Sequence, residues 1–194
     1  MNLANITDLI SRLFGMFVRK GHNLLNKKLE SLMRLSEDEF KQEFSSSDSY
    51  SINEESSLFP FLSKIIKFFA PFDTDLISDL ALGIAAFNRC PADLPEGSEL
   101  YPEQIQAAIV LTQPSILHMD TGEGKTYALL PAAFVLQRKH GRVYILCAND
   151  YLAFRDAKRT KNYWDYVGLS VSYCSQETRH RDEKWGSDII YTTA

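Results

Sequence analysis

The stretch Met119-Asp120-Thr121-Gly122-Glu123-Gly124-Lys125-Thr126 decides the fold of this chain of 194 residues. Two glycines, a lysine and a threonine at this spacing are typical of a loop that holds phosphate groups. Phosphate oxygens need several backbone N–H groups at close range, and a side chain larger than glycine would crowd that approach. Lys125 would place its charge on the terminal phosphates, and the Thr126 hydroxyl would reach Mg²⁺. The pattern therefore predicts nucleotide binding by Thr121, Gly122, Glu123, Gly124, Lys125 and Thr126.

A phosphate loop of this kind needs a strand before it and a helix after it. The sequence predicts a short strand at Ser115–His118 and a helix over 126–137, whose positive N-terminal end would face the phosphates. Pro131 lies early in that helix and is expected to bend it. Met119 stands where the strict pattern has glycine, so the loop is the tighter, helicase-like variant. The alternative is a glycine-rich turn with an exposed lysine.

Helices and strands alternate on both sides of this loop from Tyr101 onward. The predicted order is a helix at 103–111, a strand at 142–147, a helix at 151–167, and strands at 169–173 and 188–191. The apolar character of 142–147 is continuous, as in a buried parallel strand. Repeated βα units predict an α/β fold with a doubly wound parallel sheet and helices on both faces. We expect this sheet to expose an open edge at its last strand.

The first hundred residues are predicted to be helical. Apolar residues recur at helical spacing over 3–20, and this amphipathic stretch either lies on an anionic membrane surface or packs on its own domain. A helix is expected at 23–35, and Ser36 opens a capping box for a short helix through Phe44. Seven of the thirteen residues in 45–57 are serine, which indicates a flexible linker.

Four segments follow from this pattern. A further helix is expected from Asp73 or Thr74 to about Asn88, with a Pro- and Gly-containing loop at 91–97. The predicted segments are a helical N-terminal arm at 1–44, a serine-rich linker at 45–57, a helical segment at 58–98 and the first part of a nucleotide-binding domain at 99–194.

Composition narrows the class of protein. The formal net charge is −4, so no bulk basic character points to nucleic acid. The three cysteines are far apart and form no C-x-x-C pair, which favours reduced cytoplasmic thiols over disulfides or a zinc site. The sequence has no evident secretory signal and no apolar run long enough to cross a bilayer.

A second motif extends these observations to a family. The stretch 149–156 (NDYLAFRD) follows the predicted strand at 142–147. Together with MDTGEGKT it resembles SecA, the ATPase motor of bacterial protein export, whose first nucleotide-binding domain carries M-x-T-G-E-G-K-T and N-D-Y-L-A-x-R-D. The stretch 35–44 is similar to the acidic segment that follows SecA's N-terminal helix. Two departures are the extra residues at 91–98 and the missing glycine after Tyr191.

The resemblance implies a RecA-like P-loop NTPase fold that binds ATP with Mg²⁺, with Lys125 acting on the phosphates as a catalytic residue. Tyr101 and Gln104 stand where SecA has an aromatic residue followed three positions later by glutamine. A glutamine amide can pair with adenine through one donor and one acceptor. Asn149, Asp150, Arg155 and Asp156 either couple the nucleotide state to neighbouring domains or simply cap a helix and form a surface ion pair.

The resemblance also implies partners and a location. Preproteins and the SecYEG membrane channel would be the partners, residues 1–20 would contact anionic lipid, and the protein would form a homodimer. The protein would be cytoplasmic and peripherally associated with the inner face of the plasma membrane. SecA-like motors also need a downstream aspartate–glutamate pair and arginines from a second motor domain. We therefore expect no hydrolysis by these 194 residues alone.

Two alternatives remain. The first is a stand-alone truncated relative that binds a partner or a nucleotide without hydrolysing it. The second is a fragment of a nucleic-acid helicase, since the phosphate loop is shared across that superfamily. The acidic balance and the NDYLAFRD stretch count against the helicase.

Overall fold

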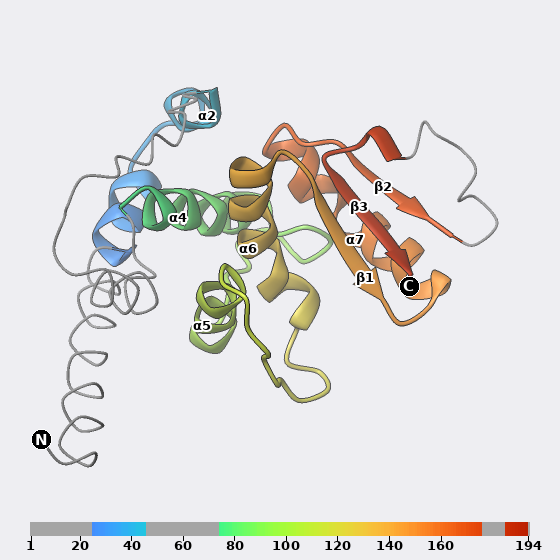
Figure 1. Ribbon diagram of the computed structural model, residues 1–194. Helices are drawn as coiled ribbons and strands as arrows, with labels where there is room; N and C mark the ends of the chain where they lie inside the picture. The colour runs from blue at the N-terminus through green and yellow to red at the C-terminus, as the bar shows by residue number, and fades with distance from the viewer. Residues whose placement is uncertain (1–24, 46–73, 176–184, 194) are drawn as a thin grey trace, which may run out of the picture.

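The structure is a computed structural model that describes residues 25–45, 74–175 and 185–193 (Figure 1). A helix covers 25–33. The other elements are α2 (Glu37–Ser45), α4 (Thr74–Arg89), α5 (Pro102–Leu111), α6 (Lys125–His140), β1 (Val143–Cys147), α7 (Asp150–Tyr166), β2 (Val171–Cys174) and β3 (Ile189–Thr193). The helix expected at 3–20 and residues 46–57 of the expected linker lie outside the described residues.

The three strands form one parallel sheet in the order β1-β3-β2. This confirms the RecA-like α/β fold, preceded by a helical region. Strand β3, the last in the chain, pairs with β1 and β2, and Ile189 lies opposite both Val143 and Val171. The prediction that the strand at 188–191 forms an open edge of the sheet is therefore wrong. The apolar run Ile189–Tyr191 is almost fully buried, which suits the centre of a sheet better than its margin.

The prediction of a strand at Ser115–His118 is also wrong. This segment has no strand conformation, and Ile116 in its middle is 102% exposed. An extended segment becomes a strand only when its N–H and C=O groups pair with a neighbouring strand. None of the strands in the described part of the chain pairs with residues 115–118. The chain thus reaches the glycine-rich loop from α5 through an unpaired stretch (Figure 1).

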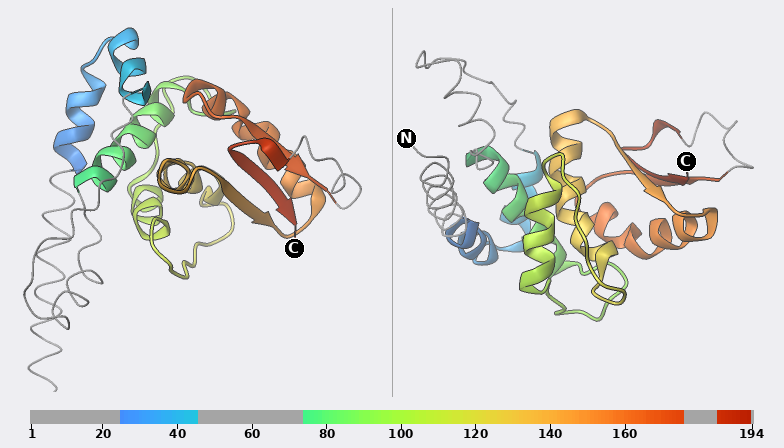
Figure 2. Two further views of the ribbon diagram at one scale, coloured as in Figure 1. Left: turned by 45° about the horizontal axis from the view of Figure 1, so that its top comes forward. Right: turned by 60° about the horizontal axis from the view of Figure 1, so that its bottom comes forward.

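Helices pack against the sheet and against one another. Helix α7 contacts all three strands, α6 contacts β1, and α4 and α5 both pack on α6 (Figures 1 and 2). A side chain at Gly83 in α4 would place its Cβ 3.1 Å from Phe134 Cδ1 and 3.2 Å from Pro131 Cα. The glycine therefore permits close packing of α4 on α6 at Pro131, which lies inside the helix and is buried.

A buried polar network joins α7 to β3. The Thr160 hydroxyl donates to the Asp156 carbonyl at 2.7 Å and accepts from Trp164 Nε1 at 3.0 Å. Tyr191 Oη lies 3.0 Å from the same hydroxyl. Because Thr160 has already used its single hydrogen, Tyr191 must be the donor in this contact. Burial raises the pKa of Tyr191 to about 12, which keeps it a neutral donor.

The N-terminal helices are fixed to the core by Arg89. Its guanidinium donates to the carbonyls of Leu32 at 3.1 Å and Leu35 at 2.8 Å, and it pairs with Glu37 at 3.0 Å. Tyr166 Oη also donates to Glu37, at 2.8 Å. These contacts hold the helix at 25–33 and α2 against α4 and α7.

The predicted capping box at the start of α2 is confirmed. The Ser36 N–H donates to Glu39 Oε2 at 2.9 Å, and the Glu39 N–H donates to Ser36 Oγ at 3.4 Å. The two side chains thus satisfy each other's backbone N–H groups at the point where the helix has none of its own acceptors.

Strand β1 forms one margin of the sheet. Its only strand partner in the described part of the chain is β3. Tyr144 is 50% exposed and Leu146 is 68% exposed, whereas the alternate residues Val143, Ile145 and Cys147 are half-buried. One face of β1 is therefore apolar and open.

Candidate nucleotide-binding site

The glycine-rich loop has the backbone conformation that its glycines permit. Gly122 and Gly124 have φ angles of 94° and 75°, in the left-handed region that other residues rarely adopt. Helix α6 begins directly after Gly124, whose carbonyl accepts from the Tyr127 N–H at 2.9 Å. The predicted helix is confirmed, and its positive N-terminal end lies at the loop.

The loop donors converge on one backbone oxygen. Lys125 Nζ donates to the Asp120 carbonyl at 2.7 Å, and the Glu123 N–H donates to the same oxygen at 3.4 Å. In return, the Asp120 N–H donates to Glu123 Oε2 at 2.7 Å. An ammonium and an N–H group directed at a single acceptor are the donor set that a phosphate oxygen requires. The residues present therefore fit a phosphate group. A phosphate oxygen would replace the Asp120 carbonyl oxygen as the acceptor of these two hydrogen bonds.

Gln104 connects the start of α5 to this loop. Its Oε1 accepts from the Tyr101 N–H at 3.0 Å, and its Nε2 donates to the Glu123 carbonyl at 2.9 Å. The side chain is only 6% exposed. Each end of the amide has capacity for a second hydrogen bond. Gln104 thus links Tyr101 at the start of α5 to Glu123 in the loop.

A hollow of about 650 Å³ lies between these elements. It is lined by Leu94 and residues 97–102, by Gln104, by residues 122–124 and by Tyr127. This volume is within the range of ligand pockets. The structure thus brings the predicted residues Tyr101, Gln104, Gly122, Glu123 and Gly124 to one hollow, with the side chain of Tyr101 69% exposed at its margin.

Three predicted residues adjoin this hollow without lining it. Lys125 is held by its bond to Asp120 on the exposed side of the loop. Thr126 is half-buried in the first turn of α6, and Thr121 is exposed in the turn before Gly122. All three are close in sequence to the convergence point at Asp120.

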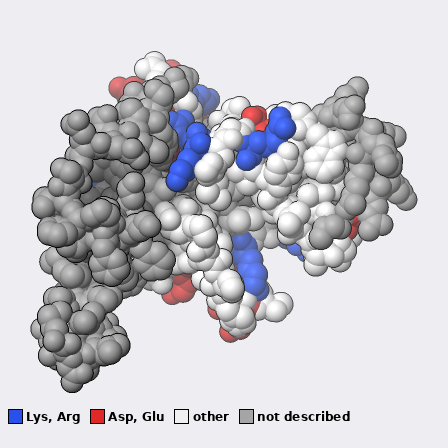
Figure 3. All heavy atoms as spheres, in the orientation of Figure 1, with Lys and Arg blue, Asp and Glu red and all other residues white. Residues whose placement is uncertain are grey.

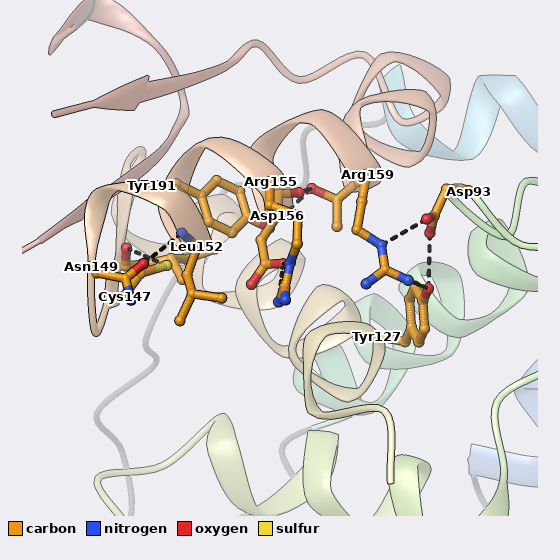
Figure 4. Close-up of polar contacts among 11 residues, drawn as sticks. Asp93, Tyr127, Cys147, Asn149, Leu152, Arg155, Asp156, Arg159 and Tyr191 are labelled. Atoms are coloured by element: carbon orange, nitrogen blue, oxygen red, sulfur yellow. Dashed lines mark hydrogen bonds and ion pairs between the residues drawn. The ribbon is translucent and has the colours of Figure 1, made fainter. Parts of the chain in front are cut away.

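The NDYLAFRD stretch begins α7 and makes internal contacts (Figure 4). Asn149 caps the helix, since its Oδ1 accepts from the Leu152 N–H at 2.8 Å. Thr193 Oγ1 donates to Asp150 at 3.0 Å, and Arg155 pairs with the adjacent Asp156 at 2.7 Å. For Asn149 the helix-capping interpretation is confirmed. The Arg155–Asp156 contact is the local ion pair of the same interpretation.

The sequence did not reveal Tyr127, which lines the hollow, or its two partners Asp93 and Arg159. Asp93 Oδ2 accepts from Arg159 Nε at 2.7 Å, and Asp93 Oδ1 accepts from Tyr127 Oη at 2.8 Å. Burial raises the pKa of Asp93, but the hydrogen bonds from Arg159 and Tyr127 outweigh it and hold this pKa below its ordinary value. The one available signal was that Asp93 lies within the extra residues 91–98.

The basic side chains do not form one continuous patch on the face shown in Figure 3, where those of the described residues lie in separate small groups. No helix in the described ranges combines the length and apolar character required to span a membrane.

Comparison with known proteins places the chain in a family. The family model of the SecA DEAD-like domain matches residues 17–194. Protein translocase subunit SecA 2 of Thermobifida fusca is 33% identical over 126 residues, which cover 63% of this chain and 16% of that protein. Protein translocase subunit SecA of Treponema pallidum is 37% identical over 99 residues, or 50% of this chain and 11% of that protein.

A further relative gives the same result. Protein translocase subunit SecA of Antithamnion sp. is 33% identical over 123 residues, which cover 62% of this chain and 13% of that protein. In each of these three matches the aligned stretch covers no more than 16% of the relative's length. The matched stretch is thus a small part of each relative but half or more of this chain. Because the family model matches residues 17–194, the chain belongs to the SecA DEAD-like domain family.

Proposed function

We propose that residues 101–126 of this chain bind ATP with Mg²⁺. The observation that carries the proposal is the convergence of Lys125 Nζ and the Glu123 N–H on one oxygen at the N-terminal end of α6. A helix N-terminus with free donors attracts phosphate, because its N–H groups and its dipole both favour a negative charge.

Each residue has a role in this proposal. Lys125 Nζ leaves its hydrogen bond to the Asp120 carbonyl and binds the terminal phosphates instead. There it stabilises their charge, which is its catalytic role in a complete motor. Thr126 supplies a hydroxyl to Mg²⁺. Backbone N–H groups of Thr121, Gly122, Glu123 and Gly124 cradle the phosphates. Tyr101 and Gln104 meet the base, with Gln104 using the second donor and acceptor of its amide.

The wider function follows from the relatives, which are named as protein translocase subunits. We propose that this chain is the N-terminal part of a SecA-like motor that uses ATP to move preproteins through the SecYEG channel. It would then act in the cytoplasm, at the inner face of the plasma membrane, as a possible homodimer. Residues 1–20 would contact anionic lipid.

For this chain by itself we propose binding without turnover. Hydrolysis needs a group held beside the terminal phosphate to orient the attacking water. The loop contains two carboxylates, Asp120 and Glu123, and Glu123 already accepts the Asp120 N–H. The stand-alone binding module therefore remains the second candidate function.

The test is thermal unfolding of the whole chain with and without ATP–Mg²⁺. A ligand present at 100 times its Kd adds about 2.7 kcal/mol to the stability of the folded state. We expect a clear rise in Tm for the wild type and none for Lys125→Ala. The matched control is Lys139→Ala, which removes an exposed lysine from the last turn of the same helix and should keep the full rise.

Two results would contradict the proposal. An equal rise in Lys125→Ala would remove the lysine from the phosphate site. An equal rise with GTP would remove Gln104 and Tyr101 from base recognition. The lipid contact is tested separately by flotation with anionic vesicles, in which deletion of residues 1–20 should abolish co-flotation.

A further inference from the structure

The loop between α4 and α5 is hydrogen-bonded to both α6 and α7. Asp93 in this loop accepts one hydrogen bond from Tyr127 of α6 and another from Arg159 of α7. Arg159 Nη2 also donates to Tyr127 Oη at 2.6 Å. Figure 4 shows the three side chains meeting, with each in contact with the other two. The triangle therefore joins three separate elements at one point.

Neighbouring contacts fix the same loop to α7. Cys90 Sγ donates to the Asn162 carbonyl at 3.5 Å, and Asn162 Nδ2 donates to the Ala92 carbonyl at 3.5 Å. A turn closes the loop just beyond, where the Leu94 N–H donates to the Pro91 carbonyl at 2.9 Å. The backbone on both sides of Asp93 is thus held in place, and its carboxylate adds the charged contact.

The loop that carries Asp93 also supplies residues that line the hollow. Leu94 follows Asp93 directly, and residues 97–102 continue the same wall of the hollow. Tyr127 also lines the hollow, and its N–H donates to the carbonyl of Gly124 in the phosphate loop. Asp93 and Arg159 do not line the hollow themselves. They act on it through Leu94 and Tyr127.

We propose that Asp93, Tyr127 and Arg159 form a positioning lock that holds the base side of the nucleotide site at a set distance from the phosphate loop. This inference rests on the proposed ATP binding. Asp93 and Arg159 are positioning residues rather than nucleotide ligands. Release of the lock frees the wall that carries Leu94 and Tyr101, while the phosphate loop keeps its own contacts to Asp120 and Gln104.

The lock therefore has a signature that separates it from general stability. A ligand with a base and a ribose needs the wall, whereas inorganic triphosphate needs only the phosphate loop. Loss of the lock should weaken ATP binding and leave triphosphate binding unchanged. A purely structural contact would lower Tm without changing the ratio of the two affinities.

The experiment is calorimetric titration of the whole chain with ATP and with inorganic triphosphate, both with Mg²⁺. Asp93→Asn removes the charge while keeping the size of the side chain. We expect its ATP affinity to fall by up to about fivefold, because the lost charged contact joins two side chains that are each more than a third exposed. Its triphosphate affinity should stay within about twofold of the wild type. The control is Glu96→Gln, which makes the same charge change on an exposed side chain of the same loop.

A second set of variants tests the triangle itself. Arg159→Gln should reduce ATP affinity as Asp93→Asn does, and the double variant should be no weaker than either single one, since all three lose the same contact. Tyr127→Phe keeps the ring against Gly124 and should cause a smaller loss of the same kind.

The outcomes separate the lock from the proposed function. A wild type that binds neither ligand overturns both. A wild type that binds both, with an Asp93→Asn variant that keeps the wild-type ratio or loses both affinities equally, overturns the lock alone. Additive losses in the double variant also overturn it.

Discussion

The side-chain amide of Gln104 donates to the carbonyl of Glu123 at 2.9 Å, and so ties the first turn of α5 to the phosphate loop 19 residues later. The contact exists only because Gly124 has no side chain. A Cβ at Gly124 would overlap with Gln104 Nε2. The loop glycine therefore serves two purposes, since it permits both the backbone turn and the approach of the glutamine.

The first prediction concerns this close approach. Gly124→Ala should abolish ATP binding, because the new methyl group displaces Gln104 from the loop. It should also destabilise the fold by about 2–4 kcal/mol, through left-handed strain of about 1–2 kcal/mol and the loss of a buried hydrogen bond. Chemical denaturation and nucleotide titration measure the two effects.

Gly141→Ala is the matched control for this variant. Gly141 ends α6 with a φ of 77°, and nothing lies within 4 Å of a Cβ there. It should therefore show only the backbone strain, about 1–2 kcal/mol, with unchanged ATP affinity. Equal effects of the two substitutions on ATP affinity would contradict the role of Gln104.

The second prediction concerns the polar network between α7 and β3. Thr160→Val keeps the shape of the side chain but removes the acceptor used by Trp164 and Tyr191. Two buried donors then lose a partner, so the free energy of unfolding should fall by about 2–4 kcal/mol. Urea denaturation measures this change.

Thr112→Val provides the comparison. Thr112 is also buried, but its hydroxyl only donates to the Ile109 carbonyl at 2.8 Å. That carbonyl also accepts the Thr112 N–H, so the loss should stay within about 1 kcal/mol. If Thr112→Val proved as costly as Thr160→Val, the buried donors could not be the cause.

The third prediction concerns the helix cap of the NDYLAFRD stretch. Asn149→Ala should destabilise the fold by about 1 kcal/mol, because the Leu152 N–H loses its acceptor. Asn149→Asp should keep the stability, since a carboxylate caps a helix N-terminus equally well. A change in the ATP affinity of Asn149→Asp at unchanged stability would instead indicate a role in coupling to the nucleotide.

The fourth prediction concerns pH. Hydrogen bonds from Tyr166 and then Arg89 lower the pKa of Glu37 in the folded state. A lowered folded pKa stabilises the protein above the unfolded value of about 4.3, and this stabilisation is lost as the pH falls through the folded pKa. Glu37→Gln should therefore be less stable than the wild type at pH 7, by a small amount because the carboxylate is about half exposed.

Urea denaturation midpoints at pH 7 and pH 3 test this sign. The difference between the wild type and Glu37→Gln should narrow at pH 3, because more of the Glu37 carboxylate is protonated there than at pH 7. Glu30→Gln, at an exposed position of the preceding helix, should match the wild type at both values. If the difference in urea midpoint between the wild type and Glu37→Gln widened at pH 3, the lowered pKa assigned to Glu37 would be contradicted.

Local patterns in the sequence predicted the helices at 103–111, 126–137 and 151–167 and the three strands of the sheet well. The capping box at Ser36, the apolar run at 142–147 and the glycine spacing around Gly124 each act within a few residues, so their structural consequences are encoded locally. The order of the strands in the sheet is not encoded in this way. The sequence run at 188–191 shows only that a strand is buried, and tertiary packing decides that it lies between β1 and β2.

The same limit applies to the site. Spacing predicted a phosphate loop that includes residues 122–124, and the resemblance to SecA added Tyr101 and Gln104. The structure brings these residues to one hollow. Spacing did not reveal Asp93, because its partners Tyr127 and Arg159 follow 34 and 66 residues later. Nor did it reveal that 115–118 would stay unpaired, since a strand depends on a neighbour that lies elsewhere in the chain.

The uncovered margin of β1 has a practical consequence for handling the protein. Tyr144 and Leu146 are exposed apolar side chains on a strand whose one strand partner among the described residues is β3. Another extended chain can add a strand to such a surface. Concentrated samples of this polypeptide should accordingly self-associate. Charged replacements at these two positions should keep it dispersed without disturbing the nucleotide site.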